Sequence, residues 1–200
     1  MPRRSAAQVE TSRHATLDAA VQVASVMGLD GVTIGCLADE LGMSKSGLVG
    51  RFGSKQDLQL ATLERAASVF RAAVYDPAAG APAGLARLNA ICDAWIAYLA
   101  QPPFPGGCFM TTVSVEFDAR GGPVADAVRT FMRRWLQALE REARVAVDAG
   151  DLRANAADVA FTLNALAVGA NCDFQLHRDE QSLRRARAAM ATVLAAADSQ

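Results

Sequence analysis

Hydrophobic residues recur every three or four positions along most of the chain, which is the spacing of a helix with one buried face. The first such stretch runs from about residue 9 or 11 to 27, and two short ones follow within 33–54. Longer stretches cover about 55–74, 83–100, 123–149, 156–176 and 179–197. Proline- and glycine-rich segments at 76–82 and 101–107 interrupt them. The pattern predicts an all-α protein.

Residues 108–117 are the one ambiguous segment. They are rich in β-branched residues, so a strand is locally possible. A single strand would have no pairing partner in an otherwise helical chain. We therefore expect a helix here too.

Residues 33–55 predict two short helices around a tight turn. Thr33 can cap the first helix, Gly42 can end it, and Ser44 can cap the second. Leu48 and Phe52 lie four apart and should face inward. A short helix with so few apolar residues is not held by its own propensity, so its exposed side should serve contact. This arrangement is typical of a helix-turn-helix that enters the DNA major groove.

The segments Gly31-Val-Thr33, Gly42-Met-Ser-Lys45 and Ser54-Lys55 resemble the amino-terminal domain of TetR/AcrR-type transcriptional regulators. The resemblance is strong over roughly the first sixty residues. It implies a homodimeric repressor that leaves its double-stranded operator when a small molecule binds the carboxy-terminal domain. It also implies a three-helix DNA-binding domain at 1–54 and a helical ligand-binding and dimerisation domain at 55–200.

Carried over by position, the resemblance assigns phosphate contacts to Thr33, Ser44 and Lys55. The start of the second helix should meet base edges or nearby phosphates. The residues expected on this surface are Lys45, Ser46, Gly47, Val49 and Arg51. Two positions depart from the family pattern, because Val49 replaces an aromatic residue and Gly50 replaces a polar or aromatic one. We expect Arg51 to compensate for the phosphate contact that is lost.

The second domain should hold an apolar ligand and a subunit interface. A mostly apolar cavity with few polar groups is how small ligands are usually held, although aromatic residues are more often plain core. The candidate ligand residues are Trp95, Tyr98, Phe109, Phe117, Phe131, Trp135, Asn164 and Phe174. The helix at 156–176 is apolar nearly all round, which requires burial on more than one face. We expect it to form a four-helix bundle between subunits with the last helix, through Leu166, Met190 and Val193.

The net charge of the chain neither supports nor refutes DNA binding. The net charge is −1, yet the only two lysines, Lys45 and Lys55, both fall in the helix-turn-helix. Arg3, Arg4, Arg13 and Arg51 would complete a local basic face. No apolar run is long enough for a membrane span, and the first residues lack the apolar stretch of a signal peptide. We expect a cytoplasmic protein with no membrane partner.

Two alternatives to a ligand-released repressor remain. Cys108 follows a Pro-Gly-Gly loop and should begin a helix, where a thiol's pKa falls; a redox or electrophile sensor would then react at Cys108 before Cys36, Cys92 or Cys172. The other alternative is a helical small-molecule-binding protein or enzyme without specific DNA binding. The scattered cysteines and two histidines form no metal-binding or nucleophile pattern, so we expect no catalysis, metal or cofactor.

Overall fold

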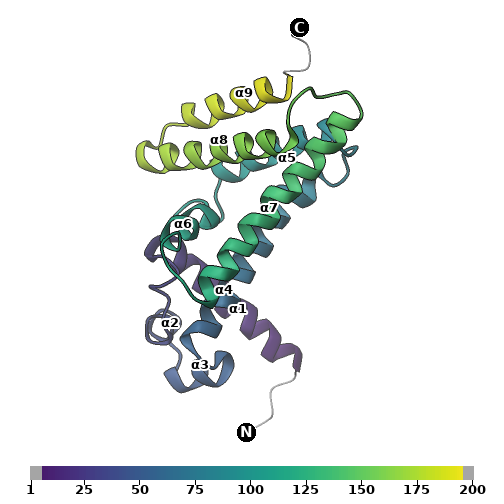
Figure 1. Ribbon diagram of the computed structural model, residues 1–200. Coiled ribbons are helices and arrows are strands. Elements are labelled where there is room, and N and C mark those ends of the chain that lie inside the picture. Colours follow the sequence, from purple (N-terminus) through teal and green to yellow (C-terminus); the bar gives the residue numbers. More distant parts are fainter. Residues whose placement is uncertain (1–5, 196–200) are drawn as a thin grey trace. The chain divides into compact units, whose positions relative to one another are not determined.

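The computed structural model describes the backbone of residues 6–195 and the side chains of residues 12–195, and the regular elements of that part are all helical (Figure 1). The helices are α1 (Ala6–Met27), α2 (Ile34–Leu41), α3 (Lys45–Phe52), α4 (Lys55–Phe70), α5 (Leu85–Ala100), α6 (Phe109–Glu116), α7 (Pro123–Asp148), α8 (Ala156–His177) and α9 (Gln181–Ala195). The all-α prediction is confirmed. The segment whose β-branched residues also allow a strand is α6.

The end of α4 departs from a regular α-helix. Residues Arg71–Tyr75 form a π-turn, η1, in which the N–H of Asp76 donates to the carbonyl of Arg71, five residues earlier. A short 3-10 turn, η2 (Asp76–Ala78), follows and ends the helix. The long helix expected over about 55–74 is therefore present, with a widened last turn.

Contacts divide the chain into two compact units. One combines Met1–Ser68 with Phe104–Arg129, and the other combines Val69–Pro103 with Thr130–Gln200. This division differs from the boundary expected after residue 54, because α6 and its flanking loops bind the helix-turn-helix region. The Glu116 carboxylate accepts hydrogen bonds from the backbone N–H groups of Leu29 and Asp30, both at 2.7 Å. These contacts join residues far apart in sequence, which the motif alone does not show.

In the first unit, the helix-turn-helix forms as the sequence predicts. Thr33 is the N-cap of α2, and its Oγ1 accepts a hydrogen bond from the N–H of Cys36 at 3.1 Å. Gly42 ends α2 with φ of 60°, a left-handed conformation that favours glycine. Ser44 caps α3 by accepting from the N–H of Gly47 at 3.2 Å. The same spacing buries the inward side of α3 through Leu48.

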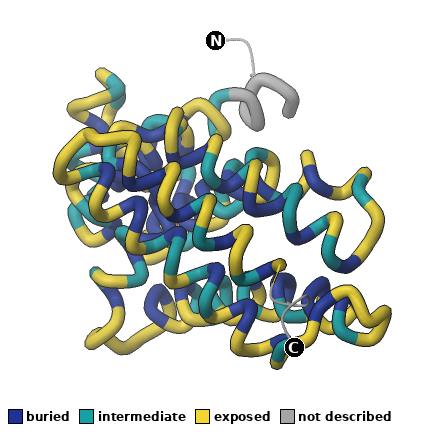
Figure 2. Tube along the Cα trace, turned by 90° about the horizontal axis from the view of Figure 1, so that it is seen from above, coloured by how far each residue is buried: buried dark blue, intermediate teal, exposed yellow. Residues whose placement is uncertain are grey.

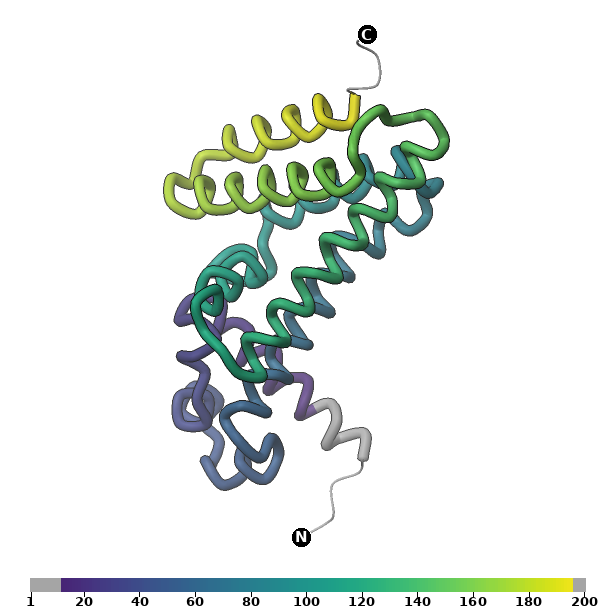
Figure 3. The backbone as a smooth tube through the Cα atoms, in the orientation of Figure 1, coloured from purple at the N-terminus to yellow at the C-terminus, as the bar shows by residue number. Residues whose placement is uncertain are grey.

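In the second unit, α8 and α9 lie side by side, and both pack on α5 (Figure 3). Buried and exposed positions alternate along the helices, as expected for amphipathic elements (Figure 2). Leu163 of α8 and Met190 of α9 have no exposed surface, while Phe161 and Leu176 on the other side of α8 are 69% and 78% exposed. Helix α8 therefore buries one apolar face within the chain and leaves another open.

The burial of Met190 corrects its assignment to a subunit interface. Its side chain is 0% exposed in a single chain, so it cannot contact a second subunit without the unit opening. Leu166 and Val193 are half-buried, so part of each side chain remains accessible. The helical spacing of the apolar residues in α9 predicts a buried face, but it does not say whether that face contacts the same chain or a second subunit.

We predict that Met190→Ala lowers the free energy of unfolding by about 2–5 kcal/mol, because it removes a fully buried side chain and leaves a cavity. Thr192→Ala, at an exposed position of the same helix, should change it by no more than about 0.5 kcal/mol. Urea denaturation measures both. Equal effects in the two variants would contradict this account of α9 packing.

Candidate DNA interface and ligand pocket

Helix α3 presents a polar, small-residue surface beside its buried side. The exposed residues are Lys45, Ser46, Gly47, Val49 and Gly50. Lys45 has no ion-pair or hydrogen-bond partner among residues 12–195, so its ammonium group is available to an anion. Val49 is 48% exposed, and a Cβ at Gly50 would meet open space. This surface is narrow enough to approach a groove closely.

The residues expected to hold phosphates flank this surface. Thr33 and Ser44 both use their hydroxyl oxygens as helix caps, which leaves each hydroxyl hydrogen available to donate. Ser46 Oγ lies 3.4 Å from Ser44 Oγ. Two hydroxyls and the unpaired Lys45 therefore surround the start of α3.

Arg51 is positioned differently from the prediction. Its Nη1 donates to the Ser12 carbonyl at 2.8 Å and to Thr16 Oγ1 at 2.7 Å. The guanidinium group thus connects α3 to α1 inside the unit instead of extending toward a DNA partner. Arg13 stacks on the Phe52 ring, 5.6 Å from its centroid, and belongs to the same packing. Arg3 and Arg4, which were expected to complete the basic face, lie outside the described residues.

Asp30 holds Lys55 in an ionic network that the sequence motif does not reveal. Its carboxylate lies 2.8 Å from Lys55 Nζ and 3.1 Å from Arg120 Nη1. The hydrogen bond from Lys55, followed by that from Arg120, lowers the pKa of Asp30. Gln59 also donates to the neighbouring Leu29 carbonyl at 2.9 Å. Lys55 must therefore exchange Asp30 for any phosphate that it binds, while Arg120 can remain with Asp30.

An aromatic cluster in the second unit brings four of the expected ligand residues together. All four surround Phe70 edge-on, with centroid distances of 6.0 Å to Trp95, 5.4 Å to Tyr98, 6.1 Å to Phe131 and 4.9 Å to Trp135. Phe70 was missing from the expected set, although its place on the apolar face of α4 was a usable signal. Perpendicular rings at these distances pack favourably beyond their area burial.

The other four expected ligand residues do not join this cluster. Phe109 packs against Phe104 at 6.2 Å, and Phe117 faces the Arg120 guanidinium at 5.2 Å, both within the first unit. Asn164 and Phe174 lie on α8. They line neither the cavity beside the aromatic cluster nor the groove between α5 and α9. The sequence correctly identified aromatic residues that are buried or half-buried, but it could not separate those of one unit from those of the other.

A cavity of about 380 Å³ opens beside the aromatic cluster. Its lining comes from the end of α4, the π-turn and α7: Phe70, Arg71, Tyr75, Phe131, Arg134, Trp135, Ala138 and Arg141. Trp135 is 7% exposed, and its indole Nε1 has no acceptor among the described residues. We call this cavity the α4–α7 pocket. An aromatic floor with a cationic edge distinguishes it.

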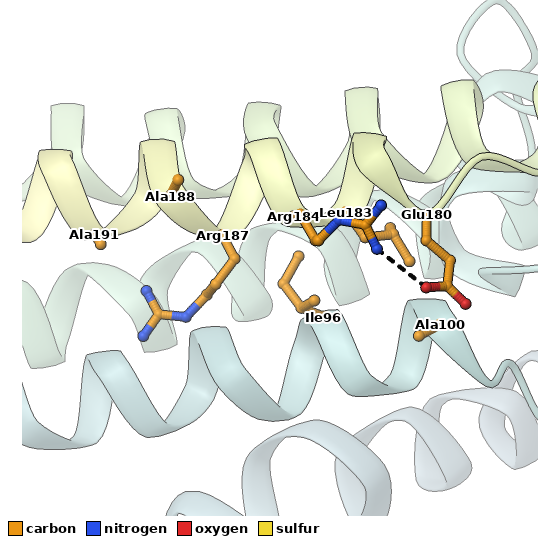
Figure 4. Close-up of a pocket in the computed structure, with 8 residues that line it drawn as sticks. All are labelled: Ile96, Ala100, Glu180, Leu183, Arg184, Arg187, Ala188 and Ala191. Carbon is orange, nitrogen blue, oxygen red and sulfur yellow. Dashed lines mark hydrogen bonds and ion pairs between the residues drawn. The ribbon is translucent and has the colours of Figure 1, made fainter.

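A larger groove of about 630 Å³ lies between α5 and α9 (Figure 4). Its arginines already have carboxylate partners: Arg184 pairs with Glu180 at 3.2 Å, and Arg187 Nε with Asp93 at 2.5 Å. Ala100, Ala188 and Ala191 supply much of the remaining wall. Both arginines of this groove thus have a carboxylate partner, while the buried Nη1 of Arg187 has no hydrogen-bond partner among the described residues.

The cysteines do not support a switch at Cys108. Cys108 is the N-cap of α6, but it is 3% exposed, so reagents cannot reach it without local opening. Burial raises the pKa of Cys92 to about 12, which disfavours its thiolate. Cys36 is half-buried and Cys172 is exposed. In a single chain the most accessible thiol is Cys172, which contradicts the expected order of reaction.

The described residues contain no group of three or more histidine, cysteine, aspartate or glutamate side chains arranged to hold a metal ion. None of their helices has both the length and the apolar content required to cross a bilayer.

Comparison with known proteins supplies independent information on the family. Residues 17–62 match the family model described as bacterial regulatory proteins, tetR family. Residues 84–190 match the model of the tetracyclin repressor-like C-terminal domain. No curated protein sequence matches the chain.

Solved structures share the fold. A TetR transcriptional regulator from Chloroflexus aurantiacus superposes with a TM-score of 0.84 at 24% identity, covering 92% of this chain and 94% of that one. AibR in complex with isovaleryl coenzyme A and operator DNA gives 0.73 at 16% identity, covering 90% and 97%. A transcriptional regulator from Saccharomonospora viridis in complex with choline gives 0.73 at 22%, covering 92% and 95%. Together with the two family models, which span the helix-turn-helix and most of the second unit, these findings show that the chain belongs to the TetR family of DNA-binding transcriptional regulators.

Proposed function

We propose that the protein is a cytoplasmic homodimeric repressor that binds an operator through α3 and leaves it when a small molecule occupies the second unit. The observation that carries this proposal is the exposed start of α3, where the hydroxyls of Ser44 and Ser46 flank Lys45, which has no partner among residues 12–195. A buried Cys108 gives no support to a thiol switch. Catalysis forms no part of the proposal.

On DNA, α3 would enter the major groove with Lys45, Ser46 and Gly47 near base edges or adjacent phosphates. Thr33 and Ser44 would donate their hydroxyl hydrogens to the backbone. Lys55 would move from Asp30 to a phosphate, and Arg120 would keep the aspartate charge neutralised. Arg51 would act from within, by holding α3 on α1.

The open face of α8 supports a second copy of the chain as partner. Phe161, Ala165, Gly169, Cys172 and Leu176 are all exposed and recur at three- or four-residue spacing along one side of the helix. Exposed large apolar side chains in such a stripe are typical of interaction surfaces. Pairing of α8 and α9 with a second copy would bury this stripe in a four-helix bundle and place two α3 helices on one operator.

Release requires a ligand that prefers the dimer conformation that does not fit the operator, since equal affinity for both states would shift nothing. The AibR complex contains both an acyl-coenzyme A and operator DNA, which supports a shared scaffold for the two kinds of ligand. The choline complex involves a cation instead. The fold alone therefore does not determine the charge of the ligand. That charge depends on the residues that line the pocket of each protein.

The direct test is selection of bound sequences from random double-stranded DNA, followed by addition of small molecules to the complex. We expect a pseudo-palindromic site with half-sites about one helical turn apart, or a small multiple of that. Release by a compound that leaves the protein folded would support repression by ligand-sensitive binding. Failure to enrich any sequence would refute the proposed function.

Lys45 and Arg51 should have separable effects. We predict that Lys45→Ala weakens operator binding by about 1–3 kcal/mol, or lowers the salt slope by about one if its contact is a phosphate. It should leave the thermal midpoint unchanged, because Lys45 has no partner among the described residues.

Arg51→Ala should lower the free energy of unfolding by about 1–3 kcal/mol, because it removes charge-assisted hydrogen bonds to α1. Full stability of Arg51→Ala together with lost DNA binding would return Arg51 to the DNA interface.

The α8 face gives a prediction about assembly. Phe161→Asp should dissociate the dimer, because the interface would bury an unpaired charge, and operator affinity should fall with it. Val115→Asp places the same charge at a 66% exposed position of α6 and serves as the control. Sedimentation measures the state of each variant, and a thiol reagent should modify Cys172 faster in Phe161→Asp than in the wild-type protein. A Phe161→Asp variant that remains dimeric would move the interface elsewhere.

A further inference from the structure

We infer that the α4–α7 pocket binds an organic anion: an apolar aromatic body that carries a carboxylate or phosphate group. The inference deepens the proposed function, since it takes this pocket as a ligand site and assigns the chemical class of the ligand. It depends on three features of the pocket: its floor, its uncompensated charge and its widened wall.

The floor accounts for the apolar body. Phe70, Phe131 and Trp135 line the pocket, and both Phe131 and Trp135 contact Phe70 edge-on. These contacts fix the rings, so they form a rigid surface before any ligand arrives. The volume of about 380 Å³ lies within the range of pockets that hold small molecules.

Two arginines at the edge of the α4–α7 pocket would bind the anionic group of the ligand. Arg134 and Arg141 are seven residues apart on α7, which places them on one side of the helix together with Phe131 and Ala138. Within residues 12–195, neither guanidinium has an ion-pair or hydrogen-bond partner. The third arginine, Arg71, is 3.2 Å from Asp76 and is already neutralised. Two unpaired positive charges therefore lie beside an apolar floor.

Several other arginines of the second unit have carboxylate partners. Arg87 pairs with Glu142 at 3.1 Å, and both arginines of the α5–α9 groove pair with carboxylates, although the buried Nη1 of Arg187 has no hydrogen-bond partner among the described residues. A guanidinium group presents several N–H donors in a plane and matches the two oxygens of a carboxylate or phosphate. The α4–α7 pocket thus combines an aromatic floor with two arginines that have no carboxylate partner within residues 12–195, which suits an external anion.

The wall of the pocket contributes a hydrogen-bond donor from Trp135 and a π-turn that widens it. Trp135 lines the pocket, and its buried Nε1–H has no acceptor among the described residues, so a ligand oxygen admitted beside it would satisfy that donor. The π-turn supplies Arg71 and Tyr75 to the opposite side. Single π-turns inside helices are frequent at functional sites.

The test uses three probes with the same body: 4-tert-butylbenzoate, 4-tert-butylphenyl phosphate and the neutral 4-tert-butylbenzamide. The chain's two tryptophans, Trp95 and Trp135, both belong to the cluster beside the pocket, so intrinsic fluorescence reports binding without DNA. We expect at least one anionic probe to bind at least about tenfold more tightly than the amide, because hydrogen bonds to charged groups are the stronger ones. The tighter of the two anions identifies the preferred headgroup.

Single substitutions test whether Arg134 and Arg141 bind the anionic group of the probe. Arg134→Gln and Arg141→Gln should each weaken the anionic probe by about tenfold and leave the amide unchanged. Arg133→Gln removes the same charge from an exposed neighbour that does not line the pocket, and it should have no effect. Equal affinity for acid and amide, an equal loss in Arg133→Gln, or no binding of any probe would overturn the inference. None of these outcomes bears on operator selection, so the proposed function stands or falls separately.

Discussion

The Glu116 carboxylate is the contact on which the first unit depends most directly. Its two oxygens accept hydrogen bonds from consecutive N–H groups, those of Leu29 and Asp30, in the turn that links α1 to α2. A Cβ at Gly28 would lie 2.9 Å from the same carboxylate, and the φ of 78° there is also suited to glycine. Because Asp30 then holds Lys55 and Arg120, this turn sets the position of the residues that flank the helix-turn-helix. One carboxylate on α6 thus holds a turn that lies more than eighty residues earlier in the chain.

Local features of the structure were predictable from the sequence, and long-range ones were not. Thr33, Gly42 and Ser44 were identified correctly because a cap or a left-handed glycine is recognised from its nearest neighbours. Periodicity likewise predicted the helices. The bonds from Arg51 to α1 were missed and Met190 was misassigned, since whether a side chain turns inward depends on elements far away in sequence. Asp30, Glu116 and Arg120 were missed for the same reason: single charged residues in loops or at helix ends carry no periodic signal.

The sequence also does not show which arginines have ion-pair partners. A net charge of −1 gives no hint that, within residues 12–195, Arg134 and Arg141 lack the carboxylate partners that Arg87, Arg184 and Arg187 have. The sequence shows an arginine-rich side of α7, which is usually a solvated face. The proposed ligand site depends on the arrangement of Phe70, Phe131 and Trp135 beside two of those arginines, which the sequence does not show.

The π-turn at Arg71–Tyr75 has a consequence for how this fold can vary. A π-turn closes its hydrogen bond over five residues, whereas an α-helix closes it over four. A protein of the same fold with one residue fewer here could continue α4 as a regular helix, keep Phe70 in the core and lose the wall formed by Arg71 and Tyr75. A single insertion or deletion at this position would then reshape the pocket while the packing on either side is kept. Ligand preference could diverge between relatives at this turn without any change to the DNA-binding helices.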